Sequence, residues 1–169
     1  EPAKDESGVY QISTAAELAW FAANGGSASA KLTADIDLEN EPWTPIGNTS
    51  KGFTGELDGA GFAVRNLYIY STADNQGLIG RLGANGKVHD LTVTGSVTTT
   101  GNTAGGIVGH APAKTSVINC LNEADVTAKT CVAGVVGKTQ GNVANANNAK
   151  NAPIIKNCGN TGTITATDA

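Results

Sequence analysis

The stretch that decides the fold is a short apolar run bounded by glycine, which occurs three times: Gly77-Leu78-Ile79-Gly80, Gly105-Gly106-Ile107-Val108-Gly109 and Ala133-Gly134-Val135-Val136-Gly137. Its closing glycines, Gly80, Gly109 and Gly137, are 29 and 28 residues apart. A fixed period of this size is the sequence signature of stacked repeats, in which each repeat buries its apolar face only against its neighbours. The period therefore predicts a solenoid rather than an ordinary globular domain.

A second signature follows each glycine motif and ends in Asn or Asp. Aligning the copies gives one column of Asn66, Asp90, Asn119 and Asn157, and a next column of Leu67, Leu91, Cys120 and Cys158. Asn and Asp enter the left-handed backbone region more readily than most other residues that carry a side chain. Their stacked side chains can also hydrogen-bond to one another along the column. We therefore expect a polar corner at this column.

Runs of β-branched residues and small turn residues separate these signatures, as expected for parallel strands that pair from one repeat to the next. Connections between parallel strands are almost always right-handed. The predicted fold class is all-β, a right-handed parallel β-helix with a short N-terminal capping helix. Its core would contain two aliphatic ladders, formed by Leu78, Ile107 and Val135 and by Val97, Val126 and Ile164.

One amphipathic helix is predicted near the N-terminus, over about residues 14–24. Thr14 and Glu17 have the spacing of a capping box, and Asn24-Gly25-Gly26 supplies a left-handed stop. Because the end of a β-helix leaves backbone groups unpaired, we interpret this helix as an end cap. A partner-binding helix is the alternative. The next segment, Lys31 to Leu38, alternates apolar and polar residues and predicts one strand with a solvated face.

The repeat alignment also divides the chain. Residues 1–8 carry no periodicity and are expected to form a flexible N-terminal segment, whereas residues 9–169 form one β-helix domain. Twenty residues separate Gly137 from Asn157, twice the corresponding spacing in the two earlier repeats. The excess predicts an inserted loop at about residues 141–152, which a solenoid tolerates because the neighbouring repeats still stack.

Composition and charge argue against two classes of partner. The 169 residues carry a net charge of -4 with only 15% charged residues, so the chain lacks the basic stripe that nucleic-acid binding requires. No run of 18 apolar residues is present, so no membrane span is expected in this segment.

The three cysteines, Cys120, Cys131 and Cys158, cannot all pair. Cys120 and Cys158 share a column, but inward side chains of adjacent strands have a geometry that is poor for a disulfide, so we expect reduced and buried thiols. No metal and no cofactor is expected, because the cysteines form no Cys-x-x-Cys pair and His89 and His110 fall in different columns.

With these residues in view, the chain resembles the bacterial GLUG-repeat family, which is named for a motif of the kind seen at residues 77–80. The opening of the chain also resembles the usual leader of this family, namely Tyr10-Gln11-Ile12, the helix, Leu32 to Leu38, Trp43-Thr44-Pro45-Ile46-Gly47 and Phe53 to Gly61. The resemblance therefore covers nearly all of residues 9–165. The family occurs in cell-surface proteins and beside some immunoglobulin A peptidases.

The resemblance implies a right-handed β-helix that is secreted or displayed on the bacterial cell surface. It implies no catalytic residues. The zinc motif of the peptidase, His-Glu-x-x-His, is absent from the chain, so peptidase activity is not carried over.

The predicted function is non-catalytic: an adhesion or structural module of a secreted or cell-surface protein. Its partners would be a host or matrix glycan or protein, or the neighbouring domains of a longer surface protein. Because no capping helix follows the last repeat, self-association through the C-terminal edge is also expected.

Two alternatives remain open. The first is a carbohydrate-binding module, in which exposed Trp43, Tyr68 and Tyr70 form a stacking surface. The second is a polysaccharide-cleaving enzyme of the β-helix type, which needs clustered carboxylates. The acidic candidates are Asp35, Asp37 and Glu39 on one strand and Glu56 and Asp58 on another. Asp35 and Asp37 share one strand face, although a solvated face is the simpler interpretation.

Overall fold

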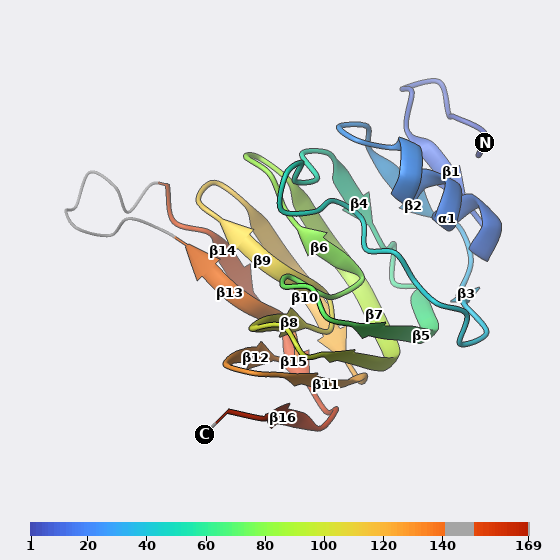
Figure 1. Cartoon of the computed structure of the whole chain (residues 1–169). Helices are drawn as coiled ribbons and strands as arrows, with labels where there is room; N and C mark the ends of the chain where they lie inside the picture. Colours follow the sequence, from blue (N-terminus) through green and yellow to red (C-terminus); the bar gives the residue numbers. More distant parts are fainter. Residues whose placement is uncertain (141–150, 169) are drawn as a thin grey trace.

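The computed structural model describes residues 1–140 and 151–168. The described chain folds as a parallel β-solenoid of about four turns with one short helix, which confirms the predicted fold class. Figure 1 shows the coils following one another from the helical N-terminal end to the C-terminal end. Segments that are distant in the sequence therefore lie side by side.

The elements of the first coils are β1 (Tyr10–Ile12), α1 (Ala15–Asn24), β2 (Ala30–Leu32), β3 (Ile36–Asp37), β4 (Glu56–Asp58), β5 (Ala63–Ser71), β6 (Ile79–Arg81) and β7 (Lys87–Thr99). Those of the later coils are β8 (Thr103–Gly105), β9 (Val108–Pro112), β10 (Ser116–Asn122), β11 (Asp125–Ala128), β12 (Cys131–Ala133), β13 (Val136–Gln140), β14 (Ile154–Lys156), β15 (Gly159–Asn160) and β16 (Ile164–Ala166).

All pairings between these strands are parallel and run from coil to coil. One series runs β1-β2-β4-β7-β10-β14, and a second runs β3-β5-β7-β11-β16. A third runs β6-β9-β13, while β8 pairs with β12 and β15 with β10. The long strand β7 belongs to the first two series because it turns a corner within its length. Side chains on its two halves therefore face different sides of the solenoid.

The predicted polar corner is confirmed at these turns. Asn66, Asp90, Asn119 and Asn157 all have left-handed backbone angles, with φ values of 55°, 53°, 53° and 53°. Asn119 Nδ2 donates a hydrogen bond to Asp90 Oδ1 at 2.8 Å, and Asn157 Nδ2 donates to Asn119 Oδ1 at 3.2 Å. Asn66 Nδ2 donates at 2.8 Å to Asp37 Oδ1, a residue that the repeat alignment did not include.

The glycine motif lies where neighbouring coils approach closely. Ile79 and Val136 both pair with Val108, which confirms the alignment of the three copies. A Cβ atom on Gly109 would lie 2.7 Å from the Gly80 carbonyl oxygen, closer than Cβ atoms come to other atoms in real proteins. A residue without a side chain is therefore required, and the motif is a packing feature of the fold.

The aliphatic ladders form the interior, and burial decreases in the last coil. Val97 pairs with Val126, and Val126 pairs with Ile164. Val97 and Val126 are fully buried, whereas Ile164 is 36% exposed. Full burial of an aliphatic side chain of this size contributes roughly 1.5–3 kcal/mol, so the last coil gains less from its ladder than the inner coils do.

The N-terminal end is closed by α1. The capping box is confirmed, because Thr14 Oγ1 accepts a hydrogen bond from the Glu17 amide at 3.2 Å and Glu17 Oε2 accepts one from the Thr14 amide at 3.2 Å. Leu18 and Phe21 are fully buried, and the Phe21 ring lies edge-on to Phe53 with the ring centroids 5.8 Å apart. The helix therefore covers the first coil of the core, as predicted for a cap.

Residues 1–8, expected to be a flexible segment, lie alongside β1. The Gln11 amide donates to the Ala3 carbonyl at 2.8 Å, and Lys4 forms an antiparallel bridge with Tyr10. The Lys4 ammonium lies 4.3 Å from the centre of the Tyr10 ring, within the range of a cation–π contact. These contacts cover the edge of β1 that faces away from β2.

Lys31 to Leu38, predicted as one strand, is two strands separated by a bend. β2 ends at Leu32 and β3 begins at Ile36. β2 pairs with β4 whereas β3 pairs with β5, so this segment crosses from one face of the coil to the next. The single-strand prediction was wrong because the alternation of buried and exposed residues continues across the corner, where Leu32, Ile36 and Leu38 are all buried.

The predicted insertion at about residues 141–152 lies mostly outside the described residues. Beyond it, the chain returns to the solenoid in register, since Ile154 of β14 pairs with Ser116 of β10. The longer spacing in this repeat therefore leaves the stacking of the strands on either side of it intact.

Candidate functional site

The outer face of β5 carries two neighbouring tyrosines, Tyr68 and Tyr70. They are two residues apart on one strand, so their side chains project to the same side. Tyr70 is 73% exposed and Tyr68 is 38% exposed. Both rings are therefore accessible to a ligand, and the tyrosine ring offers an apolar face together with a hydroxyl group.

A row of hydroxyl side chains extends this face across the following coils. Tyr70 pairs with Thr98 of β7, Thr98 pairs with Thr127 of β11, and Thr127 pairs with Thr165 of β16. Paired residues of parallel strands project to the same side of a sheet, so these four residues form one row. We call the row together with Tyr68 the tyrosine face. It combines aromatic surface with hydrogen-bonding groups, as binding sites for polar organic ligands do.

Trp43 was expected to belong to the same stacking surface, but the structure places it apart. Pro42 pairs with Tyr68, so the neighbouring Trp43 side chain turns to the opposite side of the strand and packs against the core. Its indole Nε1–H donates to the Leu78 carbonyl at 3.1 Å. Trp43 also lines a hollow of about 310 Å³ beside α1, together with Glu39. The three predicted aromatic residues therefore form no single surface.

The carboxylates considered for polysaccharide cleavage are held in structural contacts. Asp35 Oδ2 lies 2.7 Å from Arg65 Nη2, and this hydrogen bond lowers the pKa of Asp35. Asp37 accepts hydrogen bonds from the Asn66 side chain and the Glu39 amide, which lower its pKa. Neither residue is poised to act as a general acid near neutral pH, because both carboxylates are stabilised in the ionised form.

Cys120, Cys131 and Cys158 are free thiols in the described chain. Cys120 is buried, and Cys158 occupies the equivalent position of the next coil, where it is only partly buried. Burial raises the pKa of the Cys120 thiol to about 12. Cys131 pairs with Thr103, in a different sheet. The expectation of full burial therefore holds for Cys120 but not for Cys158, because Cys158 lies in the exposed last coil.

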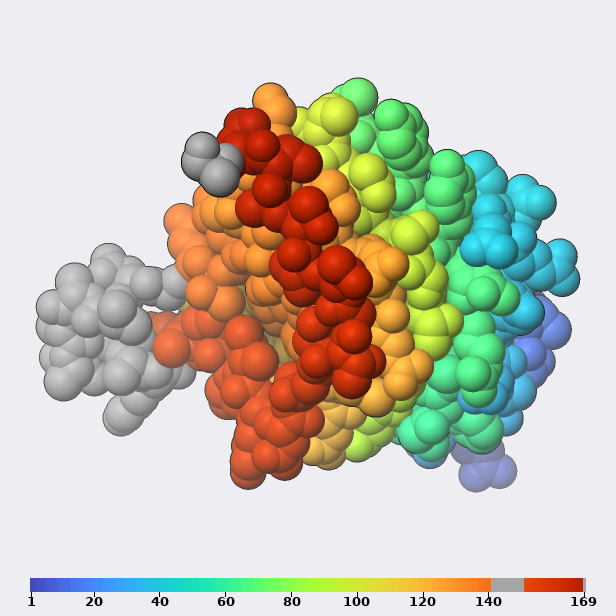
Figure 2. Space-filling view, turned by 90° about the horizontal axis from the view of Figure 1, so that it is seen from below, coloured from blue at the N-terminus to red at the C-terminus, as the bar shows by residue number. Residues whose placement is uncertain are grey.

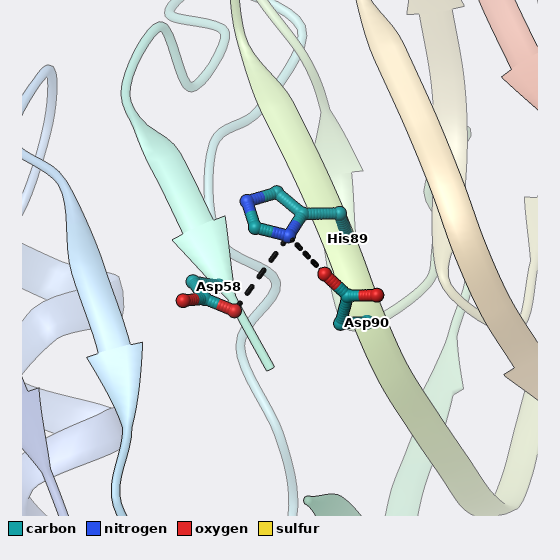
Figure 3. A group of neighbouring side chains, drawn as sticks. All are labelled: Asp58, His89 and Asp90. Atoms are coloured by element: carbon teal, nitrogen blue, oxygen red, sulfur yellow. Dashed lines mark hydrogen bonds and ion pairs between the residues drawn. The ribbon is translucent and has the colours of Figure 1, made fainter. Parts of the chain in front are cut away.

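The structure also brings together a group of side chains around His89 of β7 (Figure 3). Asp58 of β4 pairs directly with His89, and Asp90 follows His89 in the chain. His89 Nδ1 lies 2.7 Å from Asp90 Oδ2 and 3.6 Å from Asp58 Oδ1. At the other side of the ring, His89 Nε2 lies 3.2 Å from Glu56 Oε1. The imidazole therefore lies among three carboxylates.

These contacts set the charge state of the group. Burial is the largest single influence on His89 and lowers its pKa, but the hydrogen bonds to Asp90 and Glu56 outweigh burial, and the pKa is raised overall. The hydrogen bond from His89, followed by that from Lys87, lowers the pKa of Glu56. The hydrogen bonds from His89 and then from Asn119 lower the pKa of Asp90. The carboxylates of Glu56 and Asp90 are therefore stabilised as anions.

The sequence identified Glu56 and Asp58 as acidic candidates on one strand, but it did not bring them together with His89 and Asp90. Glu56 and Asp58 precede the first full repeat, so the repeat alignment gave no register for β4 against β7. Asp90 was assigned to the corner column alone, and His89 was compared only with His110. The alternation at Glu56 and Asp58 places both side chains on the same outer face of β4, but only the pairing of β4 with β7 sets that face beside His89.

The C-terminal coil exposes more apolar surface than the coils before it. Figure 2 looks onto this end, where the last residues, in red, lie across the preceding coil. Ile154 and Ile155 are 54% and 43% exposed. Among the described residues, β14 pairs only with β10, and β16 pairs only with β11, so the outer edges of both strands have no partner strand.

Comparison with known sequences places these features in context. No protein-family model matches the chain, so the resemblance to GLUG-repeat proteins has no family match to support it. The chain is 31% identical over 146 residues to halomucin from Haloquadratum walsbyi, an alignment that covers 78% of this chain and 2% of halomucin. It is 38% identical over 69 residues to a protein of Evansella cellulosilytica provisionally described as a Gly-rich membrane protein, covering 40% of this chain and 8% of that protein. The chain thus spans a small fraction of the length of these relatives.

A solved structure has the same fold. It belongs to a Bacteroides ovatus protein provisionally described as an immunoglobulin A1 protease, and it superposes on 99% of this chain and 61% of its own with a TM-score of 0.66. The sequence identity is 20%, so the likeness concerns the fold. In the part of the chain that the structure describes, no helix has both the length and the apolar character needed to cross a bilayer.

Proposed function

We propose that this chain is a non-catalytic module of a cell-surface or secreted protein and that it acts by contact, in adhesion or in assembly. The names of its relatives support a surface location: halomucin, a Gly-rich membrane protein and, by fold, an immunoglobulin A1 protease. The alignments cover only 2% and 8% of the two relatives, which suits a module that is one part of a longer chain.

The observation that carries the proposal is the tyrosine face. It presents two exposed rings and a row of threonine hydroxyls on rigid strands, and rigid strands position binding groups at little entropic cost. A flat face of this kind suits a polysaccharide or a glycosylated protein, whose sugar rings stack on tyrosine and whose hydroxyl groups bond to threonine. The ligand that we propose is therefore a host or matrix glycan.

A glycan array probed with the fluorescently labelled chain tests this ligand class. We expect binding to one or more glycans, and we expect Tyr70→Ala to weaken it by tenfold or more, since truncated aromatic hot spots commonly cost about 2 kcal/mol. Tyr70→Phe keeps the ring and should retain most of the affinity. Ile154→Ala, an exposed residue outside the tyrosine face, is the matched control and should bind like the wild type. Absence of binding to every glycan would contradict a glycan ligand.

The non-catalytic part of the proposal has its own test. The carboxylates of Asp35 and Asp37 are held by hydrogen bonds on an outer face, and these bonds lower the pKa of both groups, so neither is prepared to act as the general acid that glycoside cleavage needs. Incubation with host and plant polysaccharides should release no reducing ends above a buffer control. Release that Asp35→Asn or Asp37→Asn abolishes would instead identify an enzyme.

A second candidate function is assembly through the C-terminal coil, with a second copy of this chain as the partner. The N-terminal edge is covered by α1 and residues 1–8, so a head-to-tail stack is blocked, whereas two C-terminal coils can meet through a two-fold axis. Sedimentation at increasing concentration should show a monomer–dimer equilibrium that Ile155→Glu shifts toward monomer. A single monomeric species at every concentration would rule out this assembly.

A further inference from the structure

The group around His89 has the composition and the dimensions of a metal site. Its three donor atoms, His89 Nδ1, Asp58 Oδ1 and Asp90 Oδ2, come from side chains whose ligand atoms all lie within 4.8 Å of one another. In a tetrahedral zinc site with bonds of about 2.0–2.1 Å, ligand atoms are about 3.3 Å apart. The distances from His89 Nδ1, 2.7 Å to Asp90 and 3.6 Å to Asp58, lie on either side of that value. We propose that these three residues bind a divalent transition-metal ion of the zinc type.

The donor set selects this class of ion. One imidazole nitrogen and two carboxylate oxygens suit zinc and its neighbours in the first transition row, whereas calcium takes six to eight oxygen ligands. Three protein donors leave one tetrahedral position for water or for an oxygen atom of a bound partner. Side chains of two neighbouring coils contribute, so a bound ion would also join β4 to β7.

The outer shell of the group has the arrangement that metal-binding histidines require. A histidine that binds a metal through one nitrogen commonly donates its other N–H to a carboxylate, which fixes the ring and its tautomer. Glu56 Oε1 lies 3.2 Å from His89 Nε2 and fills this role. Asp90 is oriented in the same way, because its second oxygen, Oδ1, accepts a hydrogen bond from Asn119 Nδ2 at 2.8 Å.

The geometry also places His89 Nδ1 and one oxygen from each of Asp58 and Asp90 around a common point. When Nε2–H of His89 donates to Glu56, a neutral ring directs the lone pair of Nδ1 at the oxygens of Asp58 and Asp90. In that tautomer Nδ1 is an acceptor, and Figure 3 shows the carboxylates of Asp58 and Asp90 both turned toward it. A proton on Nδ1 satisfies the same contacts when no ion is bound, and a metal ion would take the place of that proton.

The site is open to an ion and is not blocked by the nearby lysines. The side chains of His89 and Asp58 are 25% and 24% exposed. Lys31 Nζ lies 3.5 Å from Asp58 Oδ2, and Lys87 Nζ lies 3.1 Å from Glu56 Oε2. Both ammonium groups therefore contact oxygens other than the proposed donor atoms.

Calorimetric titration of the chelator-treated chain with zinc chloride, at constant pH in a buffer that does not bind zinc, tests the proposal. We expect one ion to bind per chain. His89→Gln and Asp58→Asn should each weaken binding by tenfold or more, and so should Glu56→Gln, because loss of an outer-shell partner commonly weakens metal binding 10–100-fold. Circular dichroism of each variant checks that the solenoid is intact, and Glu56→Gln keeps the proposal testable if His89→Gln does not fold.

Matched controls separate this site from adventitious binding. His110→Gln removes the other histidine, and Cys131→Ser and Cys158→Ser remove the partly exposed thiols; all three should bind zinc like the wild type. In ¹⁵N NMR spectra, zinc should move the Nδ1 resonance of His89 and leave that of His110 unchanged. The proposal is overturned if the wild type binds no zinc at millimolar concentration, if His89→Gln binds as tightly as the wild type, or if excess calcium displaces the zinc.

Discussion

At the N-terminal end of the solenoid Leu18 and Phe21 are fully buried beneath α1, whereas at the C-terminal end Ile154 and Ile155 are 54% and 43% exposed. The coils between the two ends follow the same repeat. The edge of β1 is covered by residues 1–8, but among the described residues the outer edge of β14 is free. The repeat therefore specifies how coils stack, while residues outside the repeat decide whether an end is closed.

This contrast implies that stability is graded along the solenoid, because each coil interacts mainly with its neighbours. A substitution in an inner coil affects contacts on two sides, and the equivalent substitution in the last coil affects contacts on one. Columns of equivalent residues supply matched pairs that test the gradient.

The largest effect is expected at Val108, which is fully buried between Ile79 and Val136. Val108→Asp places an uncompensated charge in the core and should destabilise the chain by about 3–5 kcal/mol. Thermal unfolding followed by circular dichroism should show Tm lowered by roughly 6–20 °C or no folded state. Val136→Asp, in the same column but partly exposed, should have a smaller effect. A wild-type Tm for Val108→Asp would contradict the packing of Ile79, Val108 and Val136 as one buried column.

The closed end should be more sensitive than the open end to loss of an apolar side chain. Phe21→Ala removes a buried ring and should destabilise the chain by about 3–5 kcal/mol, since large cavities in cores have costs of this size. Ile155→Ala should change stability by less than about 1 kcal/mol, because the side chain is 43% exposed. Urea denaturation of the two variants measures the difference; equal losses would show that the C-terminal end is covered in solution.

A moderate effect is expected at the polar corner. Asn119 has φ 53° and hydrogen-bonds to both Asp90 and Asn157. Asn119→Ala should destabilise the chain by about 2 kcal/mol, from left-handed strain and lost hydrogen bonds together. Asn119→Gly relieves the strain and isolates the contribution of the ladder. Asn157→Ala, at the open end, breaks one ladder bond rather than two and should have a smaller effect, measured by the same denaturation experiment.

The smallest effect concerns chemistry rather than stability. Cys120 and Cys158 occupy equivalent positions, but Cys120 is buried and the pKa of its thiol is raised to about 12. Because the thiolate is the reactive form, iodoacetamide at pH 8 should modify Cys158 and Cys131 well before Cys120. Mass spectrometry of digested samples gives the order, and denaturant should make the three cysteines react alike. Early modification of Cys120 in the folded chain would indicate that the last coil opens readily.

Much of the fold could be predicted because the aligned copies of the repeat show which residues occupy equivalent positions in successive coils. The left-handed corner at Asn119 and the close packing at Gly109 follow from aligned copies and from backbone sterics. The group around His89 could not be predicted in the same way. It depends on the register of β4 against β7, and β4 lies in a coil that the alignment did not include. The placement of Trp43 was missed because the pairing of the preceding residue, Pro42, with Tyr68 decides which side Trp43 faces, and the sequence does not show this pairing.

The Asn ladder also shows where this protein tolerates added sequence. Asp90 and Asn119 are 29 residues apart and Asn119 and Asn157 are 38 apart, yet both pairs are joined by a side-chain hydrogen bond. β13 and β14, which flank the extra residues, keep their registers with β9 and β10. The point between these two strands is therefore a natural grafting position, at which an epitope or an affinity tag could be displayed while the coils on either side stay stacked.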